Sequence, residues 1–174
     1  MAPPFDEYAR RVQDRIEGHY GVAVVTRDIP DPLTGDLDGR SIHVDYLLTP
    51  EERLFLLVHL FGHTVQWNTS PKAREIGQPR QIPVPEDLLP ALVAYEREAA
   101  GYALALVHEV GIHDLDQWLA DYSACDEAYL LHYHRTGEKK PFRSFWRQGS
   151  PPVRATAVPP FSVDAEVGRH RDLA

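Results

Sequence analysis

The sequence predicts an α+β fold in a single domain, with a small sheet in its first third and helices in most of the remainder. Three observations lead to this prediction. The chain has 174 residues, of which 43% are hydrophobic, and this suffices for one core but not for two. Residues 41–47 alternate between apolar and polar side chains, as in a strand with one buried face. From residue 49 onward, the apolar residues instead follow helical patterns.

The segment before residue 49 is expected to contain one helix and the strands. Residues 5–19 predict an amphipathic helix, because their apolar residues fall on one stripe and their charged residues lie elsewhere. Residues 22–29 are rich in β-branched side chains and end at prolines, which is typical of a short strand. After the turn-rich residues 31–39 comes the alternating segment 41–47, and we expect the two strands to pair. The sequence does not place a third strand.

The start of the central helix is predicted at the segment TPEE, residues 49–52. It combines a capping threonine, a proline at the first helical position and glutamates in the first turn. This helix is expected to run to about Asn68. It is apolar nearly all round, which predicts that it is buried at the centre of the fold. Two further helices are predicted at about residues 86–110 and 115–135.

Proline-rich stretches lie between and after these helices. Residues 69–90 contain five prolines, so we expect a long irregular connection there, without regular helix. Prolines also recur through residues 141–174, which predicts an extended C-terminal arm. The expected organisation is therefore one domain over residues 1–140, with the C-terminal arm (residues 141–174) packed on it or trailing from it.

The charge balance and the single cysteine narrow the classes of protein. Eighteen Lys and Arg against 26 Asp and Glu give a net charge of −8, which argues against binding to nucleic acid or to an anionic membrane surface. The longest apolar stretch, residues 54–62, is interrupted by His59 and is far shorter than the roughly 20 residues that cross a bilayer. Cys125 has no partner for an internal disulfide. We therefore expect a soluble, cytoplasmic protein.

The candidate functional residues begin with a pair of histidines in the central helix. His59 and His63 are four residues apart, so both imidazoles leave the same face of the helix one turn apart. This arrangement suits two ligands of one zinc ion. Burying two imidazoles in an apolar helix costs free energy unless each finds a partner. Gly62, just before the second histidine, allows another element to approach closely.

A carboxylate in the following helix is a candidate third ligand. Glu96 shares a helical face with Ala99, Ala100 and Ala103, so a surface of small residues presents one carboxylate where it can pack against a neighbour. Two histidines and one glutamate would leave a fourth position for water, as in catalytic zinc sites.

These segments resemble the ImmA/IrrE-type metallopeptidases, zincins in which His-Glu-x-x-His is followed on a later helix by Glu-x-x-Ala-x-x-(Phe/Tyr)-Ala. HLFGH at residues 59–63 occupies the position of the zinc motif, and EREAAGYA at residues 96–103 matches the downstream motif. The resemblance covers about residues 5–107. It also includes an N-terminal helix, a short Gly-Val-x-Val strand, a Gly-Arg-Ser-Ile-His-Val strand and a Thr-Pro-Glu-Glu-Arg helix start. It implies a zincin-like fold with His59, His63 and Glu96 as zinc ligands.

The sequence departs from this family at one position. Leu60 stands where the family has the glutamate that takes a proton from the zinc-bound water. Such general-base assistance is worth about 10²–10⁴ in rate, and leucine supplies none of it. The resemblance therefore implies a zincin-fold protein that is degenerate as a peptidase, with zinc bound in only some preparations because no fourth protein ligand is evident.

Two alternatives remain open. In one, the chain is a metal-free module that binds a protein or peptide partner in the same cleft. In the other, it is a peptidase with a relocated base. Glu98 is about 200° around the helix from Glu96, so the two cannot both face the metal. Asp126 and Glu127 could serve only if the third helix caps the site.

Several other residues have a plainer interpretation. Residues 135–154 combine basic and aromatic side chains, and we expect the aromatics to anchor this segment to its own domain rather than to bind nucleic acid. His132 and His134 are expected at the surface near a helix end. Cys125 is expected to be a buried structural thiol.

Overall fold

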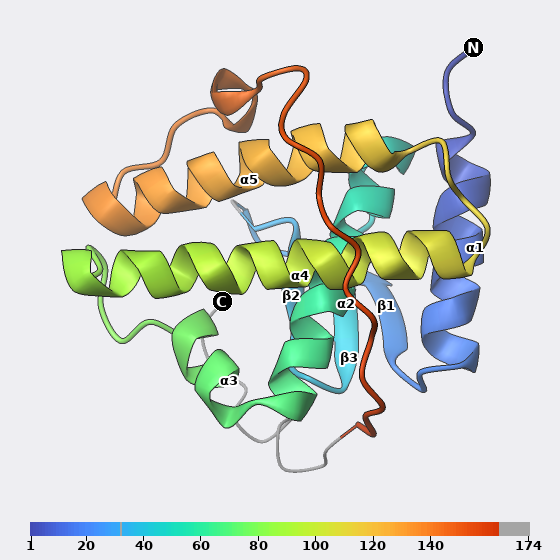
Figure 1. The fold of residues 1–174 in the computed structure, drawn as a ribbon, viewed down its shortest axis with the longest axis horizontal. Helices are drawn as coiled ribbons and strands as arrows, with labels where there is room; N and C mark the ends of the chain where they lie inside the picture. The colour runs from blue at the N-terminus through green and yellow to red at the C-terminus, as the bar shows by residue number, and fades with distance from the viewer. Residues whose placement is uncertain (32, 164–174) are drawn as a thin grey trace.

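The computed structural model describes residues 1–31 and 33–163, and these form an α+β fold, as predicted. The elements are α1 (Phe5–Gly18), β1 (Ala23–Arg27), β2 (Gly35–Leu37), β3 (Ser41–Asp45), α2 (Pro50–Thr69), α3 (Pro71–Gly77), a 3₁₀ turn η1 (Glu86–Leu88), α4 (Leu89–Glu109), α5 (Asp116–Thr136) and a second 3₁₀ turn η2 (Phe142–Phe145). Figure 1 shows α4 and α5 running side by side in opposite directions, with α2 behind them.

The sheet has three strands in the order β1-β3-β2. β1 and β3 pair in parallel, from Ala23 opposite Ser41 to Arg27 opposite Asp45, so the predicted pairing of the two strands is confirmed. β2 pairs antiparallel with β3 and is the strand that the sequence did not place. It lies within the turn-rich residues 31–39. Three residues reading Gly-Asp-Leu are too short to show an alternation, and their pairing with β3 is what makes them a strand.

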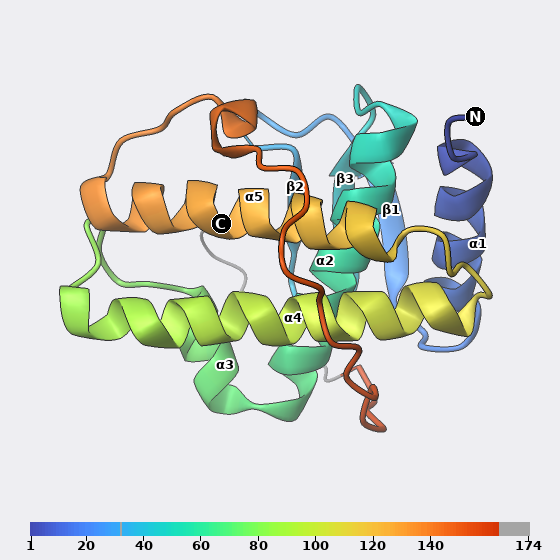
Figure 2. The same ribbon diagram turned by 45° about the horizontal axis from the view of Figure 1, so that its top comes forward.

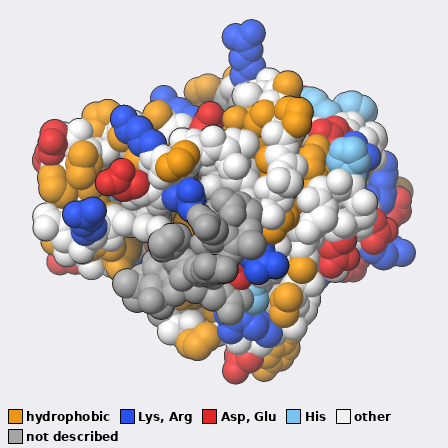
Figure 3. Space-filling model, turned by 90° about the horizontal axis from the view of Figure 1, so that it is seen from below, with side chains coloured by type: hydrophobic (Ala, Val, Ile, Leu, Met, Phe, Trp, Pro, Cys, Tyr) orange, Lys and Arg blue, Asp and Glu red, His pale blue; other side chains and the backbone are white. Residues whose placement is uncertain are grey.

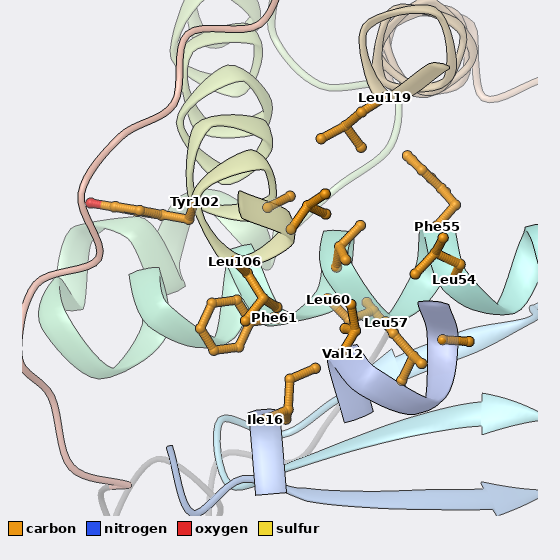
Figure 4. Close-up of a cluster of buried hydrophobic side chains, with 14 of the residues drawn as sticks. Val12, Ile16, Leu54, Phe55, Leu57, Leu60, Phe61, Tyr102, Leu106 and Leu119 are labelled. Atoms are coloured by element: carbon orange, nitrogen blue, oxygen red, sulfur yellow. The ribbon is translucent and has the colours of Figure 1, made fainter. Parts of the chain in front are cut away.

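α2 is the centre of the fold. Twelve of its twenty residues are buried, as its apolar character predicted. Figure 4 shows the sheet on one side of α2 and the helices α4 and α5 on the other. Val12 and Ile16 of α1 are fully buried and belong to the same hydrophobic cluster as Leu57 and Phe61 of α2. Burial of such side chains contributes about 1.5–3 kcal/mol each, so this cluster holds the three layers together.

The start of α2 is fixed by the capping residues that the sequence indicated. The Thr49 hydroxyl accepts a hydrogen bond from the Glu52 backbone N–H at 3.3 Å, and the Glu52 carboxylate accepts one from the Thr49 N–H at 2.9 Å. Pro50 occupies the first helical position, where no N–H is needed. Such a capping box satisfies backbone donors that the helix itself leaves free. The helical phase of His59 and His63 is thereby set from the first turn.

The expectation that residues 69–90 contain no regular helix is wrong. α3 spans Pro71–Gly77, because Pro71 lies at a first helical position and the Ser70 hydroxyl accepts a hydrogen bond from the Ala73 N–H at 3.1 Å. A proline at that position begins a helix rather than breaking it. Residues 78–85 are irregular, and the 3₁₀ turn η1 precedes α4, which starts at Leu89 rather than at residue 86.

The described part of the C-terminal arm packs on the domain. After the turn η2, residues 146–163 contain no helix or strand and cross α5 and then α4 (Figures 1 and 2). The Thr156 N–H donates a hydrogen bond to the Gly101 carbonyl at 3.1 Å, and a Cβ on Gly101 would lie 2.5 Å from the Thr156 hydroxyl. Phe161 stacks on Tyr20 at 5.6 Å. The rest of the predicted arm, residues 164–174, lies outside the described residues.

No helix of the described residues is long and apolar enough to cross a membrane. On the face shown in Figure 3, basic and acidic side chains are interspersed, with hydrophobic side chains between them.

Candidate metal centre

Three side chains from two helices meet beside α2. Each of His59, His63 and Glu96 offers one potential ligand atom, and these atoms all lie within 4.8 Å of one another. The Glu96 Oε2 atom is 3.2 Å from the Nε2 of His63 and 3.9 Å from the Nε2 of His59. The structure thus brings together the three residues that the sequence analysis singled out.

The close approach of α2 and α4 depends on the small residues noted in the sequence. A Cβ built on Gly62 would lie 2.3 Å from the Ala99 carbonyl oxygen, so the two backbones are in contact at this point. Ala99 follows Glu96 by one turn on the same face of α4. The contact therefore positions the carboxylate within reach of both imidazoles, whose centroids are 4.6 Å apart.

His63 is oriented by a hydrogen-bonded glutamine. The Gln66 side-chain amide donates to the Tyr95 carbonyl at 2.9 Å and to the Glu98 carboxylate at 2.6 Å. These two acceptors fix the NH₂ group, so the Gln66 oxygen faces the His63 Nδ1 at 2.9 Å and accepts a hydrogen bond from the Nδ1–H. The network assigns the Nδ1–H tautomer whenever His63 is neutral, which leaves the Nε2 lone pair directed at Glu96. Metal-binding histidines are commonly oriented in this way.

An aromatic wall closes this side of the site. The Tyr95 ring stacks on the His63 imidazole with centroids 4.4 Å apart, and its hydroxyl accepts a hydrogen bond from the Trp67 indole at 2.9 Å. Burial raises the pKa of Tyr95, so the hydroxyl stays protonated.

The other side of the site is formed by α5, which does cap it. The Asp126 Oδ2 atom lies 3.6 Å from the Nε2 of His59, and the side chains of both residues are mostly buried, with 16% and 14% of their surface exposed. Phe55 stacks on the His59 imidazole from within α2, at a centroid distance of 5.3 Å. Among residues 1–31 and 33–163, no group donates a hydrogen bond to Asp126.

The four ionisable groups shift one another's pKa values. Burial, followed by the positive charge of His63, lowers the pKa of His59 to about 4. Burial also acts to lower the pKa of His63, but the charge and hydrogen bond of Glu96 outweigh it and raise that pKa. Burial acts to raise the pKa of Glu96, and the charge and hydrogen bond of His63 lower it overall. Burial and the nearby Glu96 charge raise the pKa of Asp126 to about 8.

Without a metal, these shifts favour an ion pair between a protonated His63 and an ionised Glu96, and at neutral pH they leave His59 neutral and Asp126 protonated. A divalent cation would replace the positive charge that His63 supplies, because metal-bound imidazole is deprotonated.

The residues present fit a metal ion. Imidazole nitrogen and carboxylate oxygen are zinc ligands, and bonds of about 2.0–2.1 Å in a tetrahedral site separate neighbouring ligand atoms by about 3.3–3.5 Å. The distances of 3.2 and 3.9 Å from Glu96 to the two histidines lie on either side of this range. The three ligand atoms all lie within 4.8 Å of one another, and they would have to move closer together to surround one ion.

The position of the expected general base is apolar. Leu60 is 7% exposed and packs in the main hydrophobic cluster. Its side chain points toward the sheet, because a Cβ on Gly35 of β2 would lie 2.9 Å from the Leu60 Cδ1 atom. A carboxylate at this position would lie on the sheet side of the histidine cluster.

The three alternative bases occupy different surroundings. Glu98 binds Gln66 and contacts the Tyr102 hydroxyl at 3.4 Å, behind His63. Glu127 pairs with Arg97, with both hydrogen bonds at 2.9 Å. Asp126 is the carboxylate of these three that contacts a histidine of the cluster.

The expectation that His134 lies at the surface is wrong. It is partly buried, its Nδ1 atom has no hydrogen-bond partner among the described residues, and it lines a small pocket next to Glu96. Burial lowers the pKa of His134. Its position two turns after Asp126 on α5 is the signal in the sequence that could have placed it on this side of the helix.

Three further side chains lie outside the cluster. His108 pairs with Asp116 at 2.8 Å, outside the cluster. Cys125 is buried, as expected, and its thiol donates to the Phe142 carbonyl at 3.3 Å. Arg143 of the basic segment lies over the Trp146 ring at 4.5 Å and pairs with a glutamate of α2.

No family model matches this chain, and no curated protein or solved structure is significantly similar to it. The chemical interpretation of the cluster therefore depends on its own geometry.

Proposed function

We propose that this protein is a zincin-like metal-binding protein related to the ImmA/IrrE metallopeptidases, with zinc held by His59, His63 and Glu96. The observation that supports it is the convergence of these three side chains in a mostly buried site, with His63 oriented by Gln66. Zinc suits this set of nitrogen and oxygen donors, and it binds such sites more tightly than manganese or iron(II).

We also expect the protein to be inactive or very weak as a peptidase. A bound zinc ion acidifies water and polarises a carbonyl. Efficient hydrolysis also needs a group that takes a proton from that water as a base and returns it to the leaving amine as an acid, and Leu60 leaves the family's position for this group without any ionisable side chain. The expected role is therefore metal binding without efficient proteolysis.

Elemental analysis of the purified protein tests the metal site. We expect zinc in the wild-type protein and its loss in His59→Ala, while His108→Ala, which removes a histidine outside the cluster, keeps the metal. If both the wild type and His108→Ala lack zinc, the proposal is contradicted. That result would favour a metal-free module that binds a protein or peptide in the same cleft.

Digestion of an unfolded substrate tests the second part. We expect no cleavage above that of a chelator-treated control. Robust cleavage by the wild type that disappears with chelator and in His59→Ala would show instead that a relocated base operates.

A further inference from the structure

The contact between Asp126 and His59 has no role in a three-ligand zinc site. Asp126 belongs to α5, a helix outside the segment that resembles known metallopeptidases, and its Oδ2 atom faces the Nε2 of His59 at 3.6 Å. A mostly buried carboxylate normally accepts hydrogen bonds, because burying it without partners costs roughly several kcal/mol of free energy. Among the described residues, Asp126 accepts none. A cation bound in the cluster would supply the partner that the Asp126 carboxyl group lacks.

The distance itself fits coordination. Two ligand atoms 3.6 Å apart, each bonded at about 2.0–2.1 Å, enclose an angle of about 120° at the ion, which is within the range of a distorted tetrahedron. A base that takes a proton from a metal-bound water would instead lie one water farther from the ion. The Asp126 oxygen has the separation expected of a fourth ligand from His59, but the ligand atoms that all lie within 4.8 Å of one another are those of His59, His63 and Glu96, so Asp126 must move closer to the other two residues to complete the site.

The charges also balance. A divalent ion with two carboxylates and two neutral imidazoles has no net charge, whereas three ligands from His59, His63 and Glu96 leave a charge of +1. A buried site favours the neutral combination, because an uncompensated charge is costly in a low dielectric.

We infer that Asp126 is the fourth protein ligand of the metal ion and closes the position where a catalytic zinc keeps its water. This inference rests on the proposed metal site. It makes the ion a cross-link between α2, α4 and α5 with no open coordination position for a substrate. Structural zinc sites are closed by four protein ligands in this way, whereas catalytic ones keep one position open.

Metal affinity measured on the full chain tests this assignment. Zinc would be removed by chelation and returned in competition with a chromophoric chelator. We expect Asp126→Asn to weaken zinc binding by at least about tenfold, given that even residues that only orient a ligand cost 10–100-fold, roughly. Glu127→Gln removes the neighbouring carboxylate, which pairs with Arg97, and should leave the affinity unchanged. Circular dichroism of the metal-free variants controls for folding.

The visible spectrum of the cobalt-loaded protein is a second readout, and the wild type alone can contradict the inference. Cobalt(II) replaces zinc and has a visible absorption spectrum that depends on its ligands. We expect azide to leave the spectrum of the cobalt-loaded wild type unchanged and to alter that of Asp126→Asn, in which a position has opened. An azide-sensitive wild type, or equal zinc affinities for wild type and Asp126→Asn, would overturn the inference while leaving the three-ligand site intact. Failure of the wild type to bind either metal would overturn the proposed function as well.

Discussion

His59 and His63 leave the same face of α2 one turn apart, yet their surroundings differ. His63 is held on every side: Gln66 fixes its Nδ1, Glu96 pairs with its Nε2 and Tyr95 stacks on its ring. His59 has an aromatic neighbour in Phe55 and faces a carboxylate of α5 to which no described group donates a hydrogen bond.

The two histidines are therefore held in place in different ways. The His63 side is built by hydrogen bonds and by the backbone contact between α2 and α4, and it needs no ion. On the His59 side, a desolvated, protonated carboxyl group lies next to a neutral imidazole, and a cation that replaces this proton would bind both side chains. Variants on the two sides should therefore have different effects, the first mainly on folding and the second mainly on metal binding.

The largest effect is expected from Gly62→Val. Its side chain would meet the Ala99 carbonyl, because even a Cβ would be only 2.3 Å away, so α2 and α4 must separate. We expect a loss of about 3 kcal/mol in the free energy of unfolding, measured by urea denaturation of the metal-free protein. Gly18→Ala at the end of α1 meets no atom within 4 Å and should change stability by less than about 1 kcal/mol. Equal stability of the two variants would contradict the described contact.

A double variant should create activity on the His59 side. Leu60→Glu supplies the missing base and Asp126→Ala opens the metal, so together they should raise chelator-sensitive cleavage of an unfolded substrate by about 10²-fold. Leu60→Glu alone should remain inactive, because Asp126 still occupies the position of the water. Leu60→Gln with Asp126→Ala controls for the opening alone. Cleavage by the single Leu60→Glu variant would show that the site was open from the start.

Gln66→Leu tests the orientation of His63. Without the amide, nothing holds the imidazole in the Nδ1–H form, so we expect zinc affinity to fall by about tenfold. The Tyr95 carbonyl and Glu98 also lose their donor, which should cost about 1–3 kcal/mol of stability. Zinc titration and urea denaturation of the same samples separate the two effects. An unchanged affinity would mean that the aromatic wall alone orients the ring.

The smallest effect is expected where the C-terminal arm is attached to α5. Burial acts to raise the pKa of Asp121, but hydrogen bonds, first that from the Ser150 backbone N–H at 2.7 Å and then that from Gln117, lower it overall. The depressed pKa means that this carboxylate stabilises the fold above its unfolded pKa, near 3.8, and that the contribution is lost as pH falls through the folded value.

We therefore expect Asp121→Asn to cost about 1 kcal/mol at pH 6 and to differ less from the wild type near pH 3. Thermal unfolding across this pH range measures both. A difference that grows toward low pH would have the wrong sign for a depressed pKa.

The elements with strong local signals were predictable from the sequence. α2 begins at the predicted proline because Thr49 and Glu52 form a capping box, and its apolar composition identified it as the buried centre. β2 was missed because its three residues are defined only by pairing with β3. α3 was missed because Pro71 was interpreted as a helix breaker, whereas the preceding Ser70 makes it a helix start.

The candidate site shows the same division. The spacing of His59 and His63 follows from a single helix, and the motif around Glu96 indicated the third member. The contact of Asp126 depends on the position of α5 against α2, which no local pattern specifies. The spacing of His134 from Asp126 places the two residues on one side of α5, but only the packing of α5 on α4 brings that side next to Glu96.

The hydrogen bond from Trp67 to Tyr95 makes tryptophan fluorescence a probe of the site. The chain has three tryptophans, and this one is joined through the Tyr95 hydroxyl to a ring that lies flat against His63. Exchange of a proton for a divalent cation at that imidazole changes the electric field across the stacked rings and hence the emission of the indole. With Trp118 and Trp146 replaced by phenylalanine, the tryptophan fluorescence of the protein would come from this one residue. It would follow metal binding in real time without any added dye.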